Sequence, residues 1–149
     1  MSLGGGGGEM QQLQQQIEQL EQTKEAIEAE IEQLQEEKNE IDEAIEAVDQ
    51  LESGSTVQVP IGGGAYVRAE VQDMDEIIVD LGADYSAERD KEGATSTLEA
   101  KKEKLDEEIE EFRSEIAQVE TETEELEEQA EQMQAQQLQQ LQQQQQQDE

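Results

Sequence analysis

Two unbroken runs of heptad spacing are the feature that most limits how this chain folds. In the first run, apolar residues and two lysines advance by alternating steps of three and four. The a positions are Met10, Ile17, Lys24, Ile31, Lys38 and Ile45, and the d positions are Leu13, Leu20, Ile27, Leu34, Ile41 and Val48. Sustained spacing of this kind predicts a supercoiling helix that needs a partner helix.

The second heptad run supplies that partner. Its d positions are Leu98, Leu105, Phe112, Val119, Leu126 and Met133, and its a positions are Lys102, Ile109, Ile116, Thr123 and Ala130. The two runs are nearly equal in length and are joined by a short segment of different character. We therefore expect one antiparallel coiled-coil hairpin with both chain termini at the same end.

The expected register of this hairpin follows from opposing a and d positions whose numbers add up to 150. Lys38 then lies beside Phe112, where a cation–π contact is expected, and Lys24 lies beside Leu126. Near the termini Leu13 and Met10 meet glutamines, whereas Leu138 and Leu141 fall outside the seam. The sequence therefore predicts a coiled-coil tip whose apolar groups are incompletely buried. For Lys24 and Lys38, fixing the register and simple snorkelling both remain open.

The segment between the runs changes from a period of 3.5 to a period of 2. Val57, Val59 and Ile61 alternate with polar residues, and the same pattern continues over 65–71, 77–81 and, more weakly, 84–88. Alternation predicts half-buried strands. The connections at 62–64, 72–75 and 82–83 have turn chemistry. The middle segment is thus predicted to form two β-hairpins in series, and the fold class is α+β, mostly α.

The predicted organisation has five parts. A flexible glycine-rich leader (1–8) precedes the N-terminal coiled-coil helix (9–53), two β-hairpins that serve as an oligomerisation platform (54–92), the C-terminal coiled-coil helix (93–141) and a Gln-rich acidic tail (142–149). Thr95 or Ser96 is the expected cap of the second helix, with Glu99 completing a capping box after Ser96.

Composition excludes several function classes. The net charge of -32 opposes direct binding of nucleic acid and of anionic membranes, and it suits solubility in high salt. Cys and His are absent, so disulfides, thiolate or imidazole metal sites and His-based catalysis are excluded. Gly62-Gly63-Gly64 lacks the Lys-Ser/Thr of a phosphate loop. These absences lead us to expect no catalytic, cofactor or metal site. We expect a cytoplasmic protein, because no secretory or membrane-spanning run is visible.

Two groups of residues are candidate interaction sites. The oligomer interface is predicted at the strand residues Val57, Val59, Ile61, Val67, Val71, Ile77, Ile78, Val79 and Leu81. Four short strands leave open edges and little apolar area, so pairing with other hairpins would complete them. Ile78 faces away from Ile77 and Val79, which suggests a second covered face or an isolated exposed side chain. Client contact is predicted at Met10, Leu13, Ile17, Leu20, Leu126, Met133, Leu138 and Leu141. The alternatives are ordinary packing in the seam for the first six residues and a frayed helix end for the two leucines Leu138 and Leu141.

The stretch VPIGGGAYVRAEVQDMDEIIVDLGADYSAERD, residues 59–90, lies between two coiled-coil helices and resembles the alpha subunit of prefoldin, of archaeal type. The resemblance implies a hexamer of two alpha and four beta subunits whose hairpins form a β-barrel platform. It also implies ATP-independent capture of unfolded proteins at the coiled-coil tips and transfer to a group II chaperonin. The acidic charge and the glutamines at 136–147 depart from a typical member.

Two other functions compete with the chaperone hypothesis. A structural coiled-coil scaffold would have a fixed partner and would not protect unfolded proteins. An acidic mimic of DNA would account for the charge but not for two ordered hairpins.

Overall fold

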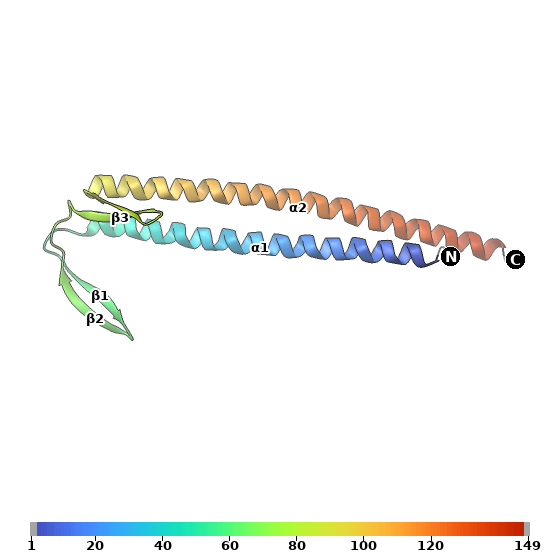
Figure 1. Cartoon of the computed structure of the whole chain (residues 1–149), viewed down its shortest axis with the longest axis horizontal. Coiled ribbons are helices and arrows are strands. Elements are labelled where there is room, and N and C mark those ends of the chain that lie inside the picture. The colour runs from blue at the N-terminus through green and yellow to red at the C-terminus, as the bar shows by residue number, and fades with distance from the viewer. Residues whose placement is uncertain (1–2, 148–149) are drawn as a thin grey trace. The chain divides into compact units, whose positions relative to one another are not determined.

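The computed structural model describes residues 3–147 and confirms an α+β, mostly α, fold. In sequence, four short strands lie between two long helices, in the order α1, β1, β2, β3, β4, α2 (Figure 1). The elements are α1 Leu3–Gln50, β1 Thr56–Gly62, β2 Ala65–Glu70, β3 Ile77–Gly82, β4 Tyr85–Arg89 and α2 Lys91–Gln147.

The chain divides into two compact units. The helical unit contains the described residues up to Glu32 and those from Ile109 onward, so it holds both chain ends. The hairpin unit, Gln33–Glu108, contains the rest of both helices and all four strands.

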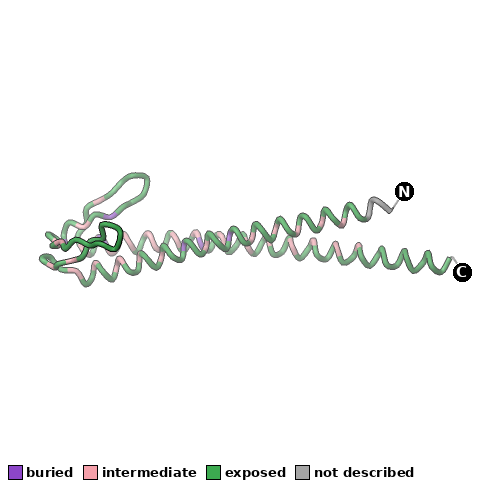
Figure 2. Tube along the Cα trace, turned by 90° about the horizontal axis from the view of Figure 1, so that it is seen from below, coloured by how far each residue is buried: buried purple, intermediate pink, exposed green. Residues whose placement is uncertain are grey.

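Burial in both units follows the predicted heptads. Every predicted a and d position in the two helices is buried or half-buried, and its exposed neighbours are mostly Glu and Gln (Figure 2). Ile27 and Ile109 are the buried apolar residues of the helical unit, and Leu34 is buried in the hairpin unit. The spacing thus positions a continuous apolar stripe on each helix, as a coiled coil requires.

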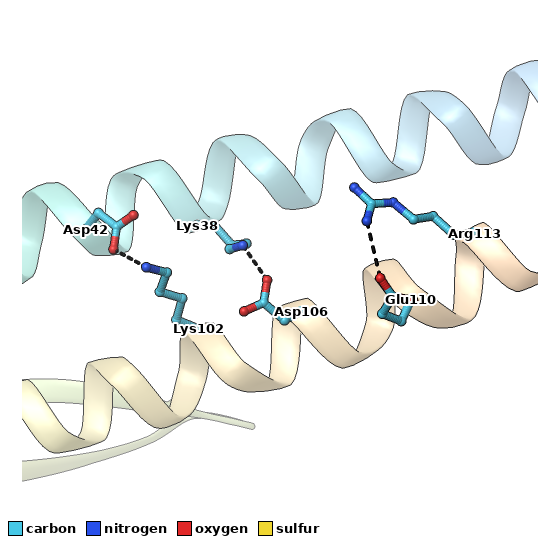
Figure 3. Close-up of polar contacts among 6 residues, drawn as sticks. All are labelled: Lys38, Asp42, Lys102, Asp106, Glu110 and Arg113. Atoms are coloured by element: carbon cyan, nitrogen blue, oxygen red, sulfur yellow. Dashed lines mark hydrogen bonds and ion pairs between the residues drawn. The ribbon is translucent and has the colours of Figure 1, made fainter.

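The register predicted from the apolar residues alone is wrong by about one heptad. In the helical unit Lys24 Nζ lies 3.0 Å from Glu120 Oε1. In the hairpin unit Lys102 Nζ lies 2.7 Å from Asp42 Oδ1, and Lys38 pairs with Asp106 rather than lying beside Phe112 (Figure 3). In each of these three pairs the carboxylate directly follows a d position, so the corresponding a and d numbers add up to 143, seven less than predicted. Apolar layers of similar size tolerate a heptad shift, whereas Lys38 does not, because the predicted register would place it opposite Arg113 instead of Asp106.

The helix limits also differ from the prediction. α1 begins at Leu3, inside the segment predicted as a leader, and ends at Gln50. Propagation of an existing helix costs far less than nucleation, so the stretch from Met10 extends toward the N-terminus despite its glycines. α2 extends to Gln147, through most of the predicted tail, and residues 148–149 lie outside the described residues.

The cap of α2 is Asp90, not Thr95 or Ser96. The amide of Gly93 donates to Asp90 Oδ1 at 2.7 Å, and the amide of Ala94 donates to the Asp90 carbonyl at 2.8 Å. An Asp side chain that accepts from the third helical amide is a strong N-cap. Gly93 allows this close approach, because a Cβ there would lie 2.8 Å from the same carboxylate oxygen.

The four strands form two separate antiparallel sheets, β1 with β2 and β3 with β4. The predicted hairpins are confirmed, and they share one geometry. In each, a glycine with positive φ follows a bulge and precedes a two-residue turn: Gly62 before Gly63-Gly64, and Gly82 before Ala83-Asp84. Both turn residues have positive φ in both hairpins, as a type I′ turn requires.

Candidate functional site

The first hairpin leaves an apolar face open. Val57 pairs with Ala69 and Val59 with Val67, so these four side chains share one face of the β1–β2 sheet. Val59 and Val67 are nevertheless exposed, and Ile61, which lies at the bulge, is 66% exposed. A two-stranded sheet is marginally stable alone, so this uncovered apolar face is a candidate interaction surface.

The second hairpin has one buried face and one exposed face. Val79 is buried, and Ile77 and Ala87 on the same face are half-buried. Ile78 points to the opposite face, as predicted, and is 70% exposed. Asp80 pairs with Ser86 on that opposite face, beside the Ile78–Glu88 pair. The exposed face is therefore mixed, with Ile78 as its large apolar group.

A side chain of α2 fixes the second hairpin within the hairpin unit. Lys101 Nζ donates to the Asp80 carbonyl at 2.8 Å, just before the bulge. Next to this hydrogen bond lies a groove of about 450 Å³, which residues of the hairpin and of both helices line, among them Leu81, Ile41 and Leu105. The β3–β4 hairpin therefore has a defined seat on the coiled coil.

The predicted interface residues thus fall into two sets. Val59, Ile61, Val67, Ile78 and Leu81 are exposed, whereas Val57, Val71 and Ile77 are half-buried and Val79 is buried. Sequence reasoning missed two exposed aromatic residues on the same hairpins, Tyr66 at 61% and Tyr85 at 72%. Their signal was residue type, because tyrosine is enriched in protein interfaces. Tyr66 pairs across the strands with Pro60.

The predicted client-binding residues, which we call the tip, also fall into a half-buried set and an exposed set. Met10, Leu13, Ile17, Leu20, Leu126 and Met133 are half-buried in the seam of the helical unit. Leu138 and Leu141 are 61% and 56% exposed, beyond the last half-buried residue of α2, Met133. The expectation that Leu13 and Met10 meet glutamines of α2 rested on the predicted register and is wrong with it.

A shallow groove of about 390 Å³ opens beside the tip. Leu20 and Leu126 line it together with polar side chains: Gln16, Gln19, Thr23, Glu122 and Glu125. The helical unit therefore presents apolar atoms of seam residues to solvent, and not only the two exposed leucines of α2.

Charge on the seam is balanced by the cross-helix ion pairs. The hydrogen bond to Glu120 raises the pKa of Lys24, and the charge of Glu120 adds to this effect. The hydrogen bond to Asp42 likewise raises the pKa of Lys102. Each ammonium is held in its charged form while its stem lies against the seam.

In the part of the chain that the structure describes, no helix has the length and apolarity to cross a membrane.

Comparison with known proteins agrees with the architecture. The family model "Prefoldin subunit" matches residues 20–147. The prefoldin alpha subunit of Haloarcula marismortui is 62% identical over 76 residues, which cover 51% of this chain and 49% of the relative. That of Halobacterium salinarum is 62% identical over 107 residues, covering 71% of this chain and 70% of the relative.

The extent of these matches varies among relatives. The chain spans about half the length of the first curated relatives it matches, 49% for the Haloarcula protein and 41% for that of Halorubrum lacusprofundi.

A solved structure shares the fold. The cryo-EM structure of a filamentous PFD from Methanocaldococcus jannaschii has a TM-score of 0.52 and 28% identity, and the match covers 78% of this chain and 93% of that one. With two helices, two intervening hairpins and a family match over most of its length, the chain belongs to the prefoldin subunit family and is similar to its alpha subunits.

Proposed function

We propose that this chain is the alpha-type subunit of an ATP-independent chaperone. Its hairpins join it to other prefoldin subunits, its tip captures unfolded proteins, and the assembly passes them to a group II chaperonin. The observation that carries the proposal is the exposed leucine pair of α2, Leu138 and Leu141, on a helix end with no remaining seam to fill. The assembly expected is two alpha and four beta subunits in the cytoplasm, with no enzymatic step.

The hairpin surface supports the assembly half of this proposal. Both sheets have only two strands, so each presents two unpaired edges, and five of the predicted interface residues are exposed. Strand addition from other subunits would pair the edges and cover Val59, Val67 and Ile78.

The tip supports the capture half. Each tip offers little apolar area, so one tip alone binds an unfolded chain weakly. Several tips on one assembly raise the effective concentration and hold a client without a deep pocket. Half-buried Met10 and Met133 suit varied clients, because methionine adapts its shape.

Two variants separate the halves. Leu138→Ser with Leu141→Ser should keep the native mass of the assembly and lose suppression of client aggregation, measured by light scattering. Val59→Asp with Val67→Asp should lose the assembly while far-UV circular dichroism still reports helix. The scaffold alternative gains support, and the proposal fails, if the wild-type assembly does not protect any unfolded client or if the leucine variant protects as well as wild type.

A further inference from the structure

Each helix of the helical unit contains an uncharged segment near its chain-terminal end, after Glu9 in α1 and after Glu131 in α2. No charged residue occurs at positions 10–17 of α1 or at positions 132–147 of α2, although the chain carries a net charge of -32. We call these two segments the neutral ends. Directly before the second of them, residues 120–131 contain seven glutamates and no basic residue. The boundary between charged and uncharged helix is therefore abrupt.

The change across this boundary is a change of charge and little else. We call the helical residues 18–50 and 91–131 the stem. Solvent-facing positions are mainly Glu in the stem and Gln in the neutral ends. Glu and Gln have almost the same helix propensity and similar size. Replacing one by the other leaves the helix intact and removes one negative charge per position.

Helix-dipole effects do not account for both neutral ends. A helix C-terminus disfavours carboxylates, which fits glutamines at the end of α2, but the effect is confined to about one turn. The neutral end of α2 is far longer than that. The neutral end of α1 begins at Met10, whereas the helix begins at Leu3, so this segment lies beyond the first turn and outside the reach of the dipole as well.

The exposed apolar groups lie within this uncharged region. Leu138 and Leu141 are three positions apart, hence on the same side of α2, and their chain neighbours are all glutamines. Amide side chains donate to and accept from a peptide backbone, and covering them removes no ionic group from water. An apolar segment can therefore dock here without desolvating a charge.

From this arrangement we propose that the neutral ends are a docking surface for apolar segments of unfolded polypeptides that carry net negative charge. The inference rests on the proposed function and adds the chemical class of the client. An acidic client is repelled by the stem, where glutamates dominate, and meets no charge of its own sign at the neutral ends. A basic client would instead be attracted along the stem, away from the leucines. For an acidic client, the leucines of the neutral end are therefore the favourable place to bind, because the stem repels it.

Added charge at the neutral ends tests the proposal. The tip-charge variant carries Gln134→Glu, Gln142→Glu and Gln145→Glu, which flank the leucines by one helical turn. The matched control, Gln33→Glu with Gln35→Glu and Gln118→Glu, adds the same charge at exposed positions of the stem. Both are prepared as full chains in the native assembly. The clients are negatively charged, neutral and positively charged surface variants of one unfolded protein.

The measurement is the assembly concentration that halves client aggregation, at low salt and in potassium chloride of about 2 M, where the Debye length is roughly 2 Å. For the negative client we expect the tip-charge variant to need roughly fivefold more assembly at low salt. The neutral client should change by less than about twofold, the stem control should match wild type, and salt should restore protection.

Equal loss for the negative and neutral clients, or no loss for either, would overturn the inference while leaving client capture in place. Failure of the wild-type assembly to protect even the neutral client would overturn client capture itself, so the two failures are distinguishable.

Discussion

Lys24 of α1 and Glu120 of α2 form an ion pair across the helical unit, with 3.0 Å between Nζ and Oε1. Lys24 is an a position, and Glu120 directly follows the d position Val119. Lys38 with Asp106 and Lys102 with Asp42 repeat this geometry in the hairpin unit. A basic residue at a and a carboxylate one position after d thus recur in three layers, which makes them register markers as well as surface pairs.

Arg113 distinguishes this register from its neighbours. In the observed register the position facing Arg113 from α1 is Ile31, and the guanidinium instead bonds Glu110 within α2 at 3.2 Å. A slip of one heptad in either direction would bring Arg113 opposite Lys24 or Lys38. Like charges at facing positions destabilise both slipped forms.

We therefore predict that Arg113→Glu permits a slipped register. The chain has no cysteine, so an Ile17→Cys and Leu126→Cys pair reports the observed register, and Ile17→Cys with Met133→Cys reports the slip. Oxidation should link the first pair alone in the wild-type background and both pairs in the Arg113→Glu background. Identical cross-linking in the two backgrounds would rule out this role for Arg113. Glu111→Gln, an exposed change nearby, is the control.

Alkaline pH should weaken the coiled coil through Lys24 and Lys102. The pKa of each is raised above its ordinary value of 10.5 in the folded chain, first by its hydrogen bond to Glu120 or Asp42. A raised pKa means that the ion pair contributes fully below pH about 10.5 and that the contribution is lost as pH rises through the folded pKa. Melting temperature measured between pH 9 and 12 should fall less for Lys24→Met than for wild type.

Exposed Lys104 provides the comparison for this titration. Lys104→Gln removes one ammonium without touching the three cross-helix pairs, so its melting curve should keep the wild-type dependence on pH. A Lys24→Met curve that runs parallel to both would show that the pair does not contribute.

Backbone strain separates the two hairpin turns. Ala83 and Asp84 have φ of 51° and 65°, whereas the first hairpin has Gly63 and Gly64 at these positions. Left-handed backbone costs a residue with a Cβ about 1 kcal/mol. Ala83→Gly should therefore stabilise the hairpin unit by up to about 1 kcal/mol, and Gly63→Ala should destabilise it by a similar amount.

The Gly63 variant isolates the backbone effect, because a Cβ at Gly63 meets nothing within 4 Å. Hydrogen exchange of strand amides in the assembled protein reads out each turn separately. Slower exchange in Gly63→Ala than in wild type would contradict the strain argument.

The cap of α2 should be measurable as well. Asp90→Ala removes the acceptor for the Gly93 amide, and loss of an N-cap costs about 1 kcal/mol. Urea denaturation followed at 222 nm should show a lower midpoint, with Glu99→Ala on the exposed helix surface as the near-neutral reference. An unchanged midpoint for Asp90→Ala would mean that another group caps the helix.

Periodicity alone was sufficient for the seam and the strands. Every position from Met10 to Val48 that the step of three and four identified is buried or half-buried, and Ala44 is the one further half-buried residue in that range. Alternation separated Ile78 from Val79 correctly. Both features depend on local geometry, which the sequence encodes residue by residue.

The register, the cap of α2 and the second turn were predicted wrongly, because they depend on contacts between side chains and on backbone detail that periodicity does not encode. Apolar layers do not distinguish heptad shifts, and only the match of Lys24, Lys38 and Lys102 with carboxylates across the helices selects one. The cap was missed because Gly93 is a poor helix former, so the sequence did not suggest a helix that begins before it. The Gly93 amide in fact donates to the Asp90 side chain. The second turn was predicted one residue early, at Gly82-Ala83, because Gly82 serves the bulge and the turn itself is Ala83-Asp84.

The two hairpins give the proposed assembly a property familiar from polymer chemistry. The two sheets are separate, so under the proposed assembly each hairpin acts as one reactive group and the chain acts as a bifunctional monomer. A monomer with one reactive group can only terminate a growing assembly, whereas one with two can also extend it. Losing either hairpin would therefore turn this subunit from a chain extender into a chain stopper, whatever its coiled coil still binds.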